Sequence, residues 1–148
     1  MIGGGRDNLV ENNIFVDCNP SIHVDARGIS WASFWFNGKD ATLMDGLNAV
    51  HYNQPPYSSA YPHLADILSD NPAFPKYNTI SHNISFGGSW INWNDGLNDK
   101  VVTVKDNLVG QDPDFANLKT QDFHLLPGSP AWKLGFKIIP IEKIGPGK

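Results

Sequence analysis

Three ionisable side chains alternate with apolar ones in the segment 22–27, which reads Ile-His-Val-Asp-Ala-Arg. Successive side chains of a β-strand point to opposite faces, so His23, Asp25 and Arg27 would share the outer face of a strand whose other face enters the core. A carboxylate beside a guanidinium and an imidazole suits acid–base chemistry or the binding of a polar substrate. The alternative is a solvated strand face with a structural Asp25–Arg27 ion pair.

A short motif occurs three times in the chain. Residues 8–15 (NLVENNIF) align with residues 78–85 (NTISHNIS) at an offset of 70, and residues 102–109 (VTVKDNLV) follow the second copy 24 residues later. Each copy alternates apolar and polar residues and then has an Asn. The three Asn residues are Asn13, Asn83 and Asn107.

The alternation predicts half-buried strands, and the Asn predicts a turn, because Asn tolerates the left-handed backbone conformation. A spacing of 24 residues suits one coil of a solenoid, in which each repeat buries its core only against its neighbours. Stacked Asn side chains would then hydrogen-bond to one another. Three unrelated strands that share an Asn–aliphatic pair are the competing interpretation.

Asp95 lies 70 residues after Asp25, so the same offset predicts that these two carboxylates face each other. Neighbouring strands lie about 4.8 Å apart, and next-but-one strands about twice that. Retaining glycosidases hold their two carboxyl groups roughly 5–5.5 Å apart, and inverting ones roughly 6.5–9.5 Å apart. We therefore expect Asp25 and Asp95 to be a catalytic pair if the register holds, with Asp45 as a second candidate partner for Asp25.

Residues 29–74 form an insertion between the first and second Asn turns. They open on an aromatic run, and short helices are expected over residues 41–50 and 61–68. An insertion of this size on a solenoid typically forms a wall beside a binding face. The candidate platforms for sugar rings are Trp31, Trp35 and Trp93. For each of them, packing against the core is the alternative.

Two stretches resemble right-handed parallel β-helix proteins. The first is GGGRDNLVENNIFVDC in residues 3–18, followed by SIHVDARG in residues 21–28. The second, in residues 112–136, reads DPDF and then DFHLLPGSPAWKLGF, which is similar to the closing segment of large bacterial β-helix glycoside hydrolases and related lyases. The resemblance covers most of the chain and concerns the scaffold more than the reaction, since one fold hosts many chemistries.

This resemblance implies an all-β fold of the pectin lyase-like kind: a right-handed parallel β-helix, or solenoid, of about three to four coils with a mixed helical and loop insertion. It implies a single domain over residues 1–148, with residues 112–148 as the closing segment. Family members have many more coils and this chain opens inside one, so we expect the C-terminal part of a longer protein. The alternative is that residues 29–74 partly cover the open end. The resemblance further implies an extracellular or periplasmic location for the full-length protein.

Three functions follow from these residues and the resemblance, each with a polysaccharide or oligosaccharide as partner. The first is glycoside hydrolysis, with Asp25 as acid or base, Asp95 or Asp45 as its partner, and substrate bound by His23 and Arg27. The second is a polysaccharide lyase, in which Arg27 or His23 would be the base. The third is a non-catalytic end of a longer protein, either carbohydrate-binding or structural.

The composition counts against several other classes. A net charge of −4 with no run of Lys or Arg argues against nucleic acid as a partner, and the longest apolar stretch falls far short of the ~20 residues that cross a bilayer. The single cysteine, Cys18, excludes an internal disulfide and a cysteine-based metal cluster. No cofactor or metal is predicted. A Ca²⁺ site from Asp17, Asp25 and backbone oxygens rests on chemical grounds alone.

Overall fold

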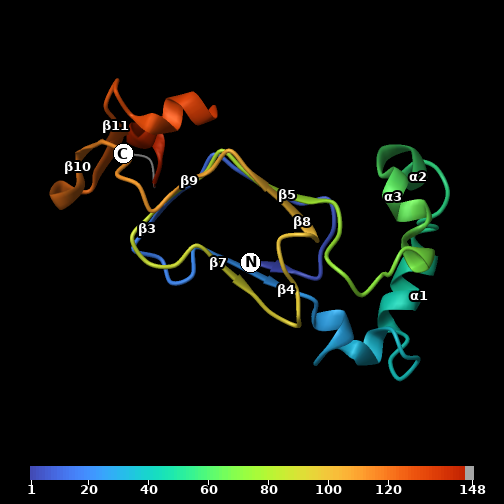
Figure 1. The fold of residues 1–148 in the computed structure, drawn as a ribbon. Coiled ribbons are helices and arrows are strands. Elements are labelled where there is room, and N and C mark those ends of the chain that lie inside the picture. Colours follow the sequence, from blue (N-terminus) through green and yellow to red (C-terminus); the bar gives the residue numbers. More distant parts are fainter. Residues whose placement is uncertain (146–148) are drawn as a thin grey trace.

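A computed structural model describes residues 1–145 of the chain, and Figure 1 shows their fold. Nine short strands form three parallel sheets of three strands each. The sheets are β1 (Ile2–Gly3), β4 (Ile22–Asp25) and β7 (Ile91–Trp93); β2 (Leu9–Glu11), β5 (Asn78–Ser81) and β8 (Val102–Lys105); and β3 (Ile14–Val16), β6 (Ile84–Phe86) and β9 (Leu108–Val109). Each sheet therefore contributes one strand to a first layer (β1, β2, β3), one to a middle layer (β4, β5, β6) and one to a third layer (β7, β8, β9).

The repeat sets the register of two of the sheets. Ile14 lies opposite Ile84, and Ile84 lies opposite Leu108, at the predicted offsets of 70 and 24. The strands β2, β5 and β8 pair at the same two offsets. The prediction that the three copies of the motif pair with one another is thus confirmed.

The three motif asparagines form a hydrogen-bonded ladder across the layers. The backbone N and the Nδ2 of Asn13 both donate to Oδ1 of Asn83, at 3.0 and 2.9 Å. The same two groups of Asn83 donate to Oδ1 of Asn107, both at 2.9 Å. The left-handed residues, however, stand one position earlier than predicted, at Asn12 (φ 59°) and His82 (φ 53°). The asparagine satisfies backbone groups, and the residue before it makes the turn.

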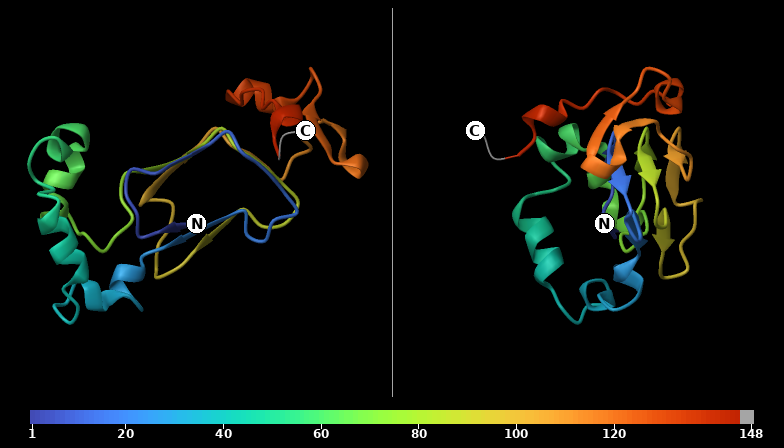
Figure 2. Two further views of the ribbon diagram at one scale, coloured as in Figure 1. Left: turned by 180° about the vertical axis from the view of Figure 1, so that it is seen from behind. Right: turned by 90° about the vertical axis from the view of Figure 1, so that its left-hand side faces the viewer.

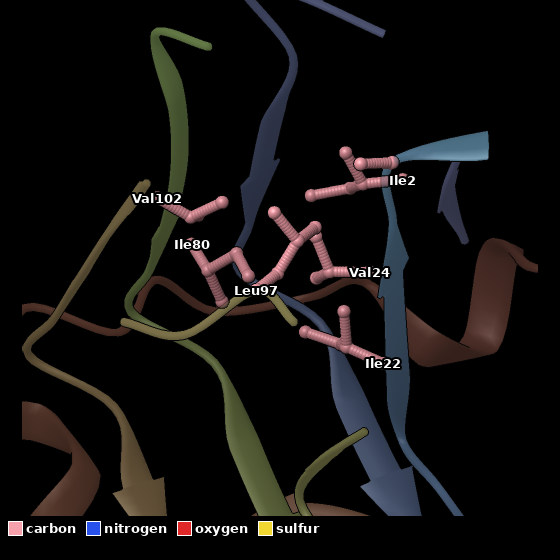
Figure 3. Close-up of a cluster of buried hydrophobic side chains, with 7 residues drawn as sticks. Ile2, Ile22, Val24, Ile80, Leu97 and Val102 are labelled. Atoms are coloured by element: carbon pink, nitrogen blue, oxygen red, sulfur yellow. The ribbon is translucent and has the colours of Figure 1, made fainter. Parts of the chain in front are cut away.

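The main apolar core lies between the sheets (Figure 3). Its members include Ile2, Ile22, Val24, Ile80, Leu97 and Val102. Side chains of the middle layer are the most deeply buried, because a strand covers them on each side. Val24 and Ile80 are fully buried, whereas Val10 in the first layer and Val104 in the third are only partly buried.

The insertion folds into short helices, which Figure 1 shows beside the sheets and away from the C-terminal segment. They are η1 (Arg27–Ile29), η2 (Ser33–Trp35), α1 (Thr42–Ala49), α2 (Tyr57–Ala60), α3 (Pro62–Ala65) and η3 (Ile67–Ser69). The helix expected over residues 41–50 is present as α1, and the one expected over residues 61–68 is divided into α3 and η3. In the C-terminal segment, β10 (Phe115–Asn117) and β11 (Asp122–Leu125) pair antiparallel, and η4 (Leu118–Thr120), η5 (Pro130–Leu134) and η6 (Ile141–Lys143) accompany them.

The predicted fold class, an all-β right-handed parallel β-helix of three to four coils, is wrong. The structure is mixed α/β: three α-helices and several 3₁₀ helices accompany separate, short sheets, none of which closes on itself within the described residues. The repeat predicts which strands pair but carries no information on residues 26–77, where the chain turns helical. The parallel strand pairs of this chain lie in the three motif copies and in the short strands next to them. The motif therefore led us to expect more β structure than the chain contains.

Candidate functional site

The strand β4 carries His23 and Asp25 as the alternation predicts, but it ends at Asp25, and Arg27 begins the helix η1. Ile22 and Val24 point into the core, with exposed fractions of 4% and 0%. His23 and Arg27 are half-buried on the other face, and Asp25 is 7% exposed because its neighbours cover it. The site therefore begins with a carboxylate enclosed by polar groups rather than with a solvated one.

Asp25 and Arg27 form a two-pronged ion pair. Arg27 Nε donates to Oδ1 of Asp25 at 2.9 Å, and Nη2 donates to Oδ2 at 2.8 Å. The backbone N of Arg27 also donates to Oδ1, at 3.2 Å. The hydrogen bonds from Arg27 lower the pKa of Asp25, although burial opposes them, and the same pairing raises the pKa of Arg27. Asp25 is thus held ionised and in a fixed orientation.

Gly3 in the first layer makes room for this ion pair. Gly3 lies opposite Asp25 in the pairing of β1 with β4. A Cβ at this position would stand 2.1 Å from Nη2 of Arg27, so any other residue would displace the guanidinium. The glycine lets the arginine lie across the edge of the sheet.

His23 is oriented by partners on both sides. Its Nε2 lies 3.3 Å from Oδ2 of Asp25, and Nδ2 of Asn94 lies 3.3 Å from its Nδ1. Nδ2 of Asn94 also lies 3.1 Å from Nε2, so the amide of Asn94 faces the edge of the imidazole between its two nitrogens. Asn92, opposite His23 in β7, adds a further amide at 3.5 Å. Sequence reasoning missed both asparagines, because they become neighbours of His23 only in the observed register.

Asp95 does not lie opposite Asp25. β4 pairs with β7 as Val24↔Trp93, an offset of 69, so the position across from Asp25 belongs to Asn94. The cause is the connection between strands, which is one residue longer after β3 (residues 17–21) than after β6 (residues 87–90). The offset of 70 that holds in the other two sheets is lost there.

Asp95 nevertheless reaches the same end of β4. Its Oδ2 accepts a hydrogen bond from the backbone N of Ala26 at 3.0 Å, and Oδ1 of Asp25 accepts one from the next backbone N, that of Arg27. Consecutive backbone nitrogens lie under about 4 Å apart, so these two carboxylate oxygens are within about 10 Å of each other. Asp95 is exposed, unlike Asp25.

Trp31 is the aromatic residue nearest to this ion pair. The guanidinium carbon of Arg27 lies 5.4 Å from the centre of the Trp31 ring, and 65% of the Trp31 side chain remains exposed. This distance fits a cation–π contact, which fixes the ring on the surface. The exposed indole thus lies on the Arg27 side of Asp25, toward the first layer, whereas the imidazole of His23 and the amide of Asn92 lie toward the third layer.

The other predicted residues form no hydrogen bond or ion pair with Asp25. Trp35 is half-buried and lines a hollow of about 390 Å³ with residues of α1. Trp93 is half-buried against the core. Asp45 is exposed on α1, which contacts η2 and makes no comparable contact with β4. Asp17 is exposed in the turn after β3, and within residues 1–145 no three His, Cys, Asp or Glu side chains gather in a metal-binding arrangement.

The comparisons with known proteins leave the resemblance as a prediction. No family model, no curated protein and no solved structure matches this chain. Among the described residues, no helix has the length and apolar character needed to span a membrane.

Proposed function

We propose that the protein binds a polysaccharide through the face formed by His23, Asn92, Arg27 and Trp31. The observation that carries this proposal is the exposed indole of Trp31, held in place by a guanidinium that is itself fixed by Asp25. The faces of pyranose rings are apolar and stack on aromatic rings, while their hydroxyl groups exchange hydrogen bonds with amides and imidazoles. A pre-fixed ring binds with little loss of side-chain entropy.

Affinity electrophoresis against a panel of neutral and acidic polysaccharides tests this proposal. For the polysaccharide that retards the wild-type chain, we expect Trp31→Ala to abolish the retardation and Trp31→Phe to retain part of it. Tyr61→Ala is the matched control, because Tyr61 is similarly exposed (61%) on the insertion and lines a hollow with His63 and Leu64. Equal retardation of the wild type and Trp31→Ala would contradict the proposal.

Glycoside hydrolysis on the same face is a second candidate. It is favoured by the attachment of Asp25 and Asp95 to consecutive backbone nitrogens, which keeps the bound oxygens within about 10 Å, an upper limit that includes the roughly 5–9.5 Å separations of glycosidases. Because the pKa of Asp25 is lowered, Asp25 would act as base or nucleophile, which leaves the acid role to Asp95. A lyase mechanism is less favoured, since the raised pKa of Arg27 makes it a poor base and leaves only His23.

Asp95→Asn separates hydrolysis from binding. An asparagine at this position retains the oxygen that accepts from Ala26 but cannot donate an acidic proton. If the protein is a hydrolase, Asp95→Asn should lower the release of reducing sugar at least about a hundredfold while binding stays at the wild-type level. No release of reducing ends by the wild type from any polysaccharide that it binds would leave binding alone as the function.

A further inference from the structure

Both outer layers of the sheets end in unpaired strand edges. Within residues 1–145, each strand of the first layer and of the third layer pairs with a single neighbour. Figure 2 shows the layers side by side, with the edges of the outer layers facing away from each other. Outward-facing backbone N–H and C=O groups on such edges can pair with a further strand.

The two outer layers also leave the core incomplete. Val10, Ile80 and Val104 occupy one position in the first, middle and third layers, and only Ile80 is fully buried. At the third layer two adjoining hollows, of about 810 and 440 Å³, share Asp99 and Val104 in their linings. A further layer of strands would cover this apolar surface.

One pair of charged residues on the two edges is complementary, and its acidic member, Glu11, also lies 3.2 Å from Nδ1 of His82 in its own chain. Glu11 in β2 and Lys105 in β8 both align with Ser81 of β5, so they occupy the same position in opposite outer layers. If the third layer of one copy lay against the first layer of another, Lys105 would face Glu11 across one strand spacing, about 4.8 Å. Opposite charges at directly facing strand positions stabilise the pairing.

The asparagine ladder is complementary in the same direction. Within residues 1–145, Oδ1 of Asn13 accepts no hydrogen bond and the backbone N of Asn107 donates none, whereas Asn83 between them does both. A second copy stacked in register would place Asn13 of the next chain where Asn107 stands relative to Asn83, so the backbone N of Asn107 would donate to Oδ1 of that Asn13. The ladder would then continue from one chain into the next.

We propose that this protein associates head to tail with a second copy of itself, the third layer of one chain pairing in parallel with the first layer of the next. Because the two surfaces are different, the contact is heterologous and repeats into rods unless an end is covered. Each copy would add three strand spacings, roughly 14 Å, between successive Trp31 faces. That last consequence rests on the proposed polysaccharide binding, whereas the association does not.

Sedimentation velocity over rising protein concentration tests the association directly. The wild-type chain, 16.3 kDa as a monomer, should form concentration-dependent larger species. Lys105→Glu and Glu11→Lys each place like charges across the contact and should weaken association about tenfold or more. An equimolar mixture of the two variants should regain wild-type association, because each contact in the mixed rod then joins a Lys to a Glu.

Lys119→Glu is the control, since it makes the same charge change at an exposed residue of η4, outside the three sheets. It should associate like the wild type. Far-UV circular dichroism shows whether each variant is folded. If Glu11→Lys does not fold, the weaker association of Lys105→Glu alone tests the proposal. A monomer at every concentration, association unchanged by Lys105→Glu, or no recovery in the mixture of folded variants would each overturn the proposal.

Discussion

The three sheets and the insertion of residues 29–74 are held together by different forces. In the sheets, the middle layer buries Val24, Ile80 and Ile84 completely, and the asparagine ladder satisfies backbone groups between layers. In the insertion, the helices α1, α2 and α3 contain no buried residue. Apolar burial therefore stabilises the sheets, whereas the insertion has apolar anchors only near its ends, at Ala32, which is fully buried, and at Phe74, which packs against the core.

A polar cluster around Asp70 also attaches the insertion to the sheets. Asp70 accepts hydrogen bonds from Arg6 Nη1 at 2.7 Å and from the Tyr77 hydroxyl at 2.6 Å, and it pairs with Lys76. His63 of α3 stacks on the Tyr77 ring at 3.9 Å between centres. The pKa of Asp70 lies well below its usual range, first because of the bond from Lys76 and then because of those from Tyr77 and Arg6. The cluster is ionic and lies near the surface, so the attachment of the insertion should weaken in acid.

The largest effect should come from the centre of the ladder. Asn83 is 1% exposed. Asn83→Ala removes the oxygen that accepts from the backbone N and the Nδ2 of Asn13, and it removes the amide that donates to the carbonyls of Val10 and Ser81. Buried groups left without partners are costly, so we expect a loss of about 3 kcal/mol in the free energy of unfolding. Urea denaturation followed by circular dichroism measures it.

Asn8→Ala is the matched control for that variant. Asn8 also donates from its backbone N and its Nδ2 to an asparagine of the next layer, Asn78, but it is exposed at the edge of the sheet. Water can replace the partners there, so the loss should stay below about 1 kcal/mol. Equal losses in the two variants would show that the middle layer has no special role.

The predictable part of the fold is the part that repeats. Asn13, Asn83 and Asn107 revealed which strands pair and at which offsets, because a ladder needs the same residue in every layer. In the insertion α1 and the pair α3 and η3 were expected, whereas η1, η2 and α2 were not, because helices of three or four residues depend on tertiary contacts rather than on a strong pattern of their own. The all-β class failed for this reason.

The residues of β4 that form the candidate site could be predicted, but the residues that lie opposite them in β7 could not. Alternation placed His23 and Arg27 on one face, and the pairing of Asp25 with Arg27 follows from their spacing. The offset of 70 could not place Asp95, because a single extra residue in a connecting loop shifts a whole strand by one position. No residue type in that loop marks the change.

An intermediate effect should come from the attachment of the insertion. Asp70→Asn removes the charge that Arg6 and Lys76 share, so the insertion should become more susceptible to limited proteolysis while the urea midpoint of the sheets changes little. Since the folded pKa of Asp70 is lowered, its stabilisation is fully present above the ordinary aspartate pKa of ~3.9 and is lost as the pH falls through the lower folded value. Hydrogen exchange of residues 29–74 at falling pH should show this loss in the wild type. Exchange that responds to acid equally in Asp70→Asn would assign the pH dependence to other groups.

The smallest effect should come from a single methyl group in α1. Gly46 lies in the interior of this helix, and a Cβ there would meet no atom within 4 Å. Gly46→Ala should therefore stabilise α1 by about 0.5–1 kcal/mol, because alanine loses less backbone entropy on folding. The gain should appear as slower hydrogen exchange in α1, with the urea midpoint of the sheets unchanged.

The same substitution should have the opposite sign in the sheet region. Gly88, between β6 and β7, has a φ of 67°, and a Cβ there would stand 1.9 Å from the carbonyl oxygen of Cys18. Gly88→Ala should thus lower the urea midpoint of the sheets and leave exchange in α1 unchanged. If Gly46→Ala instead raised the urea midpoint of the sheets, the insertion and the sheets would unfold as one cooperative unit, and the Asp70 cluster would couple them more strongly than its exposed ionic contacts suggest.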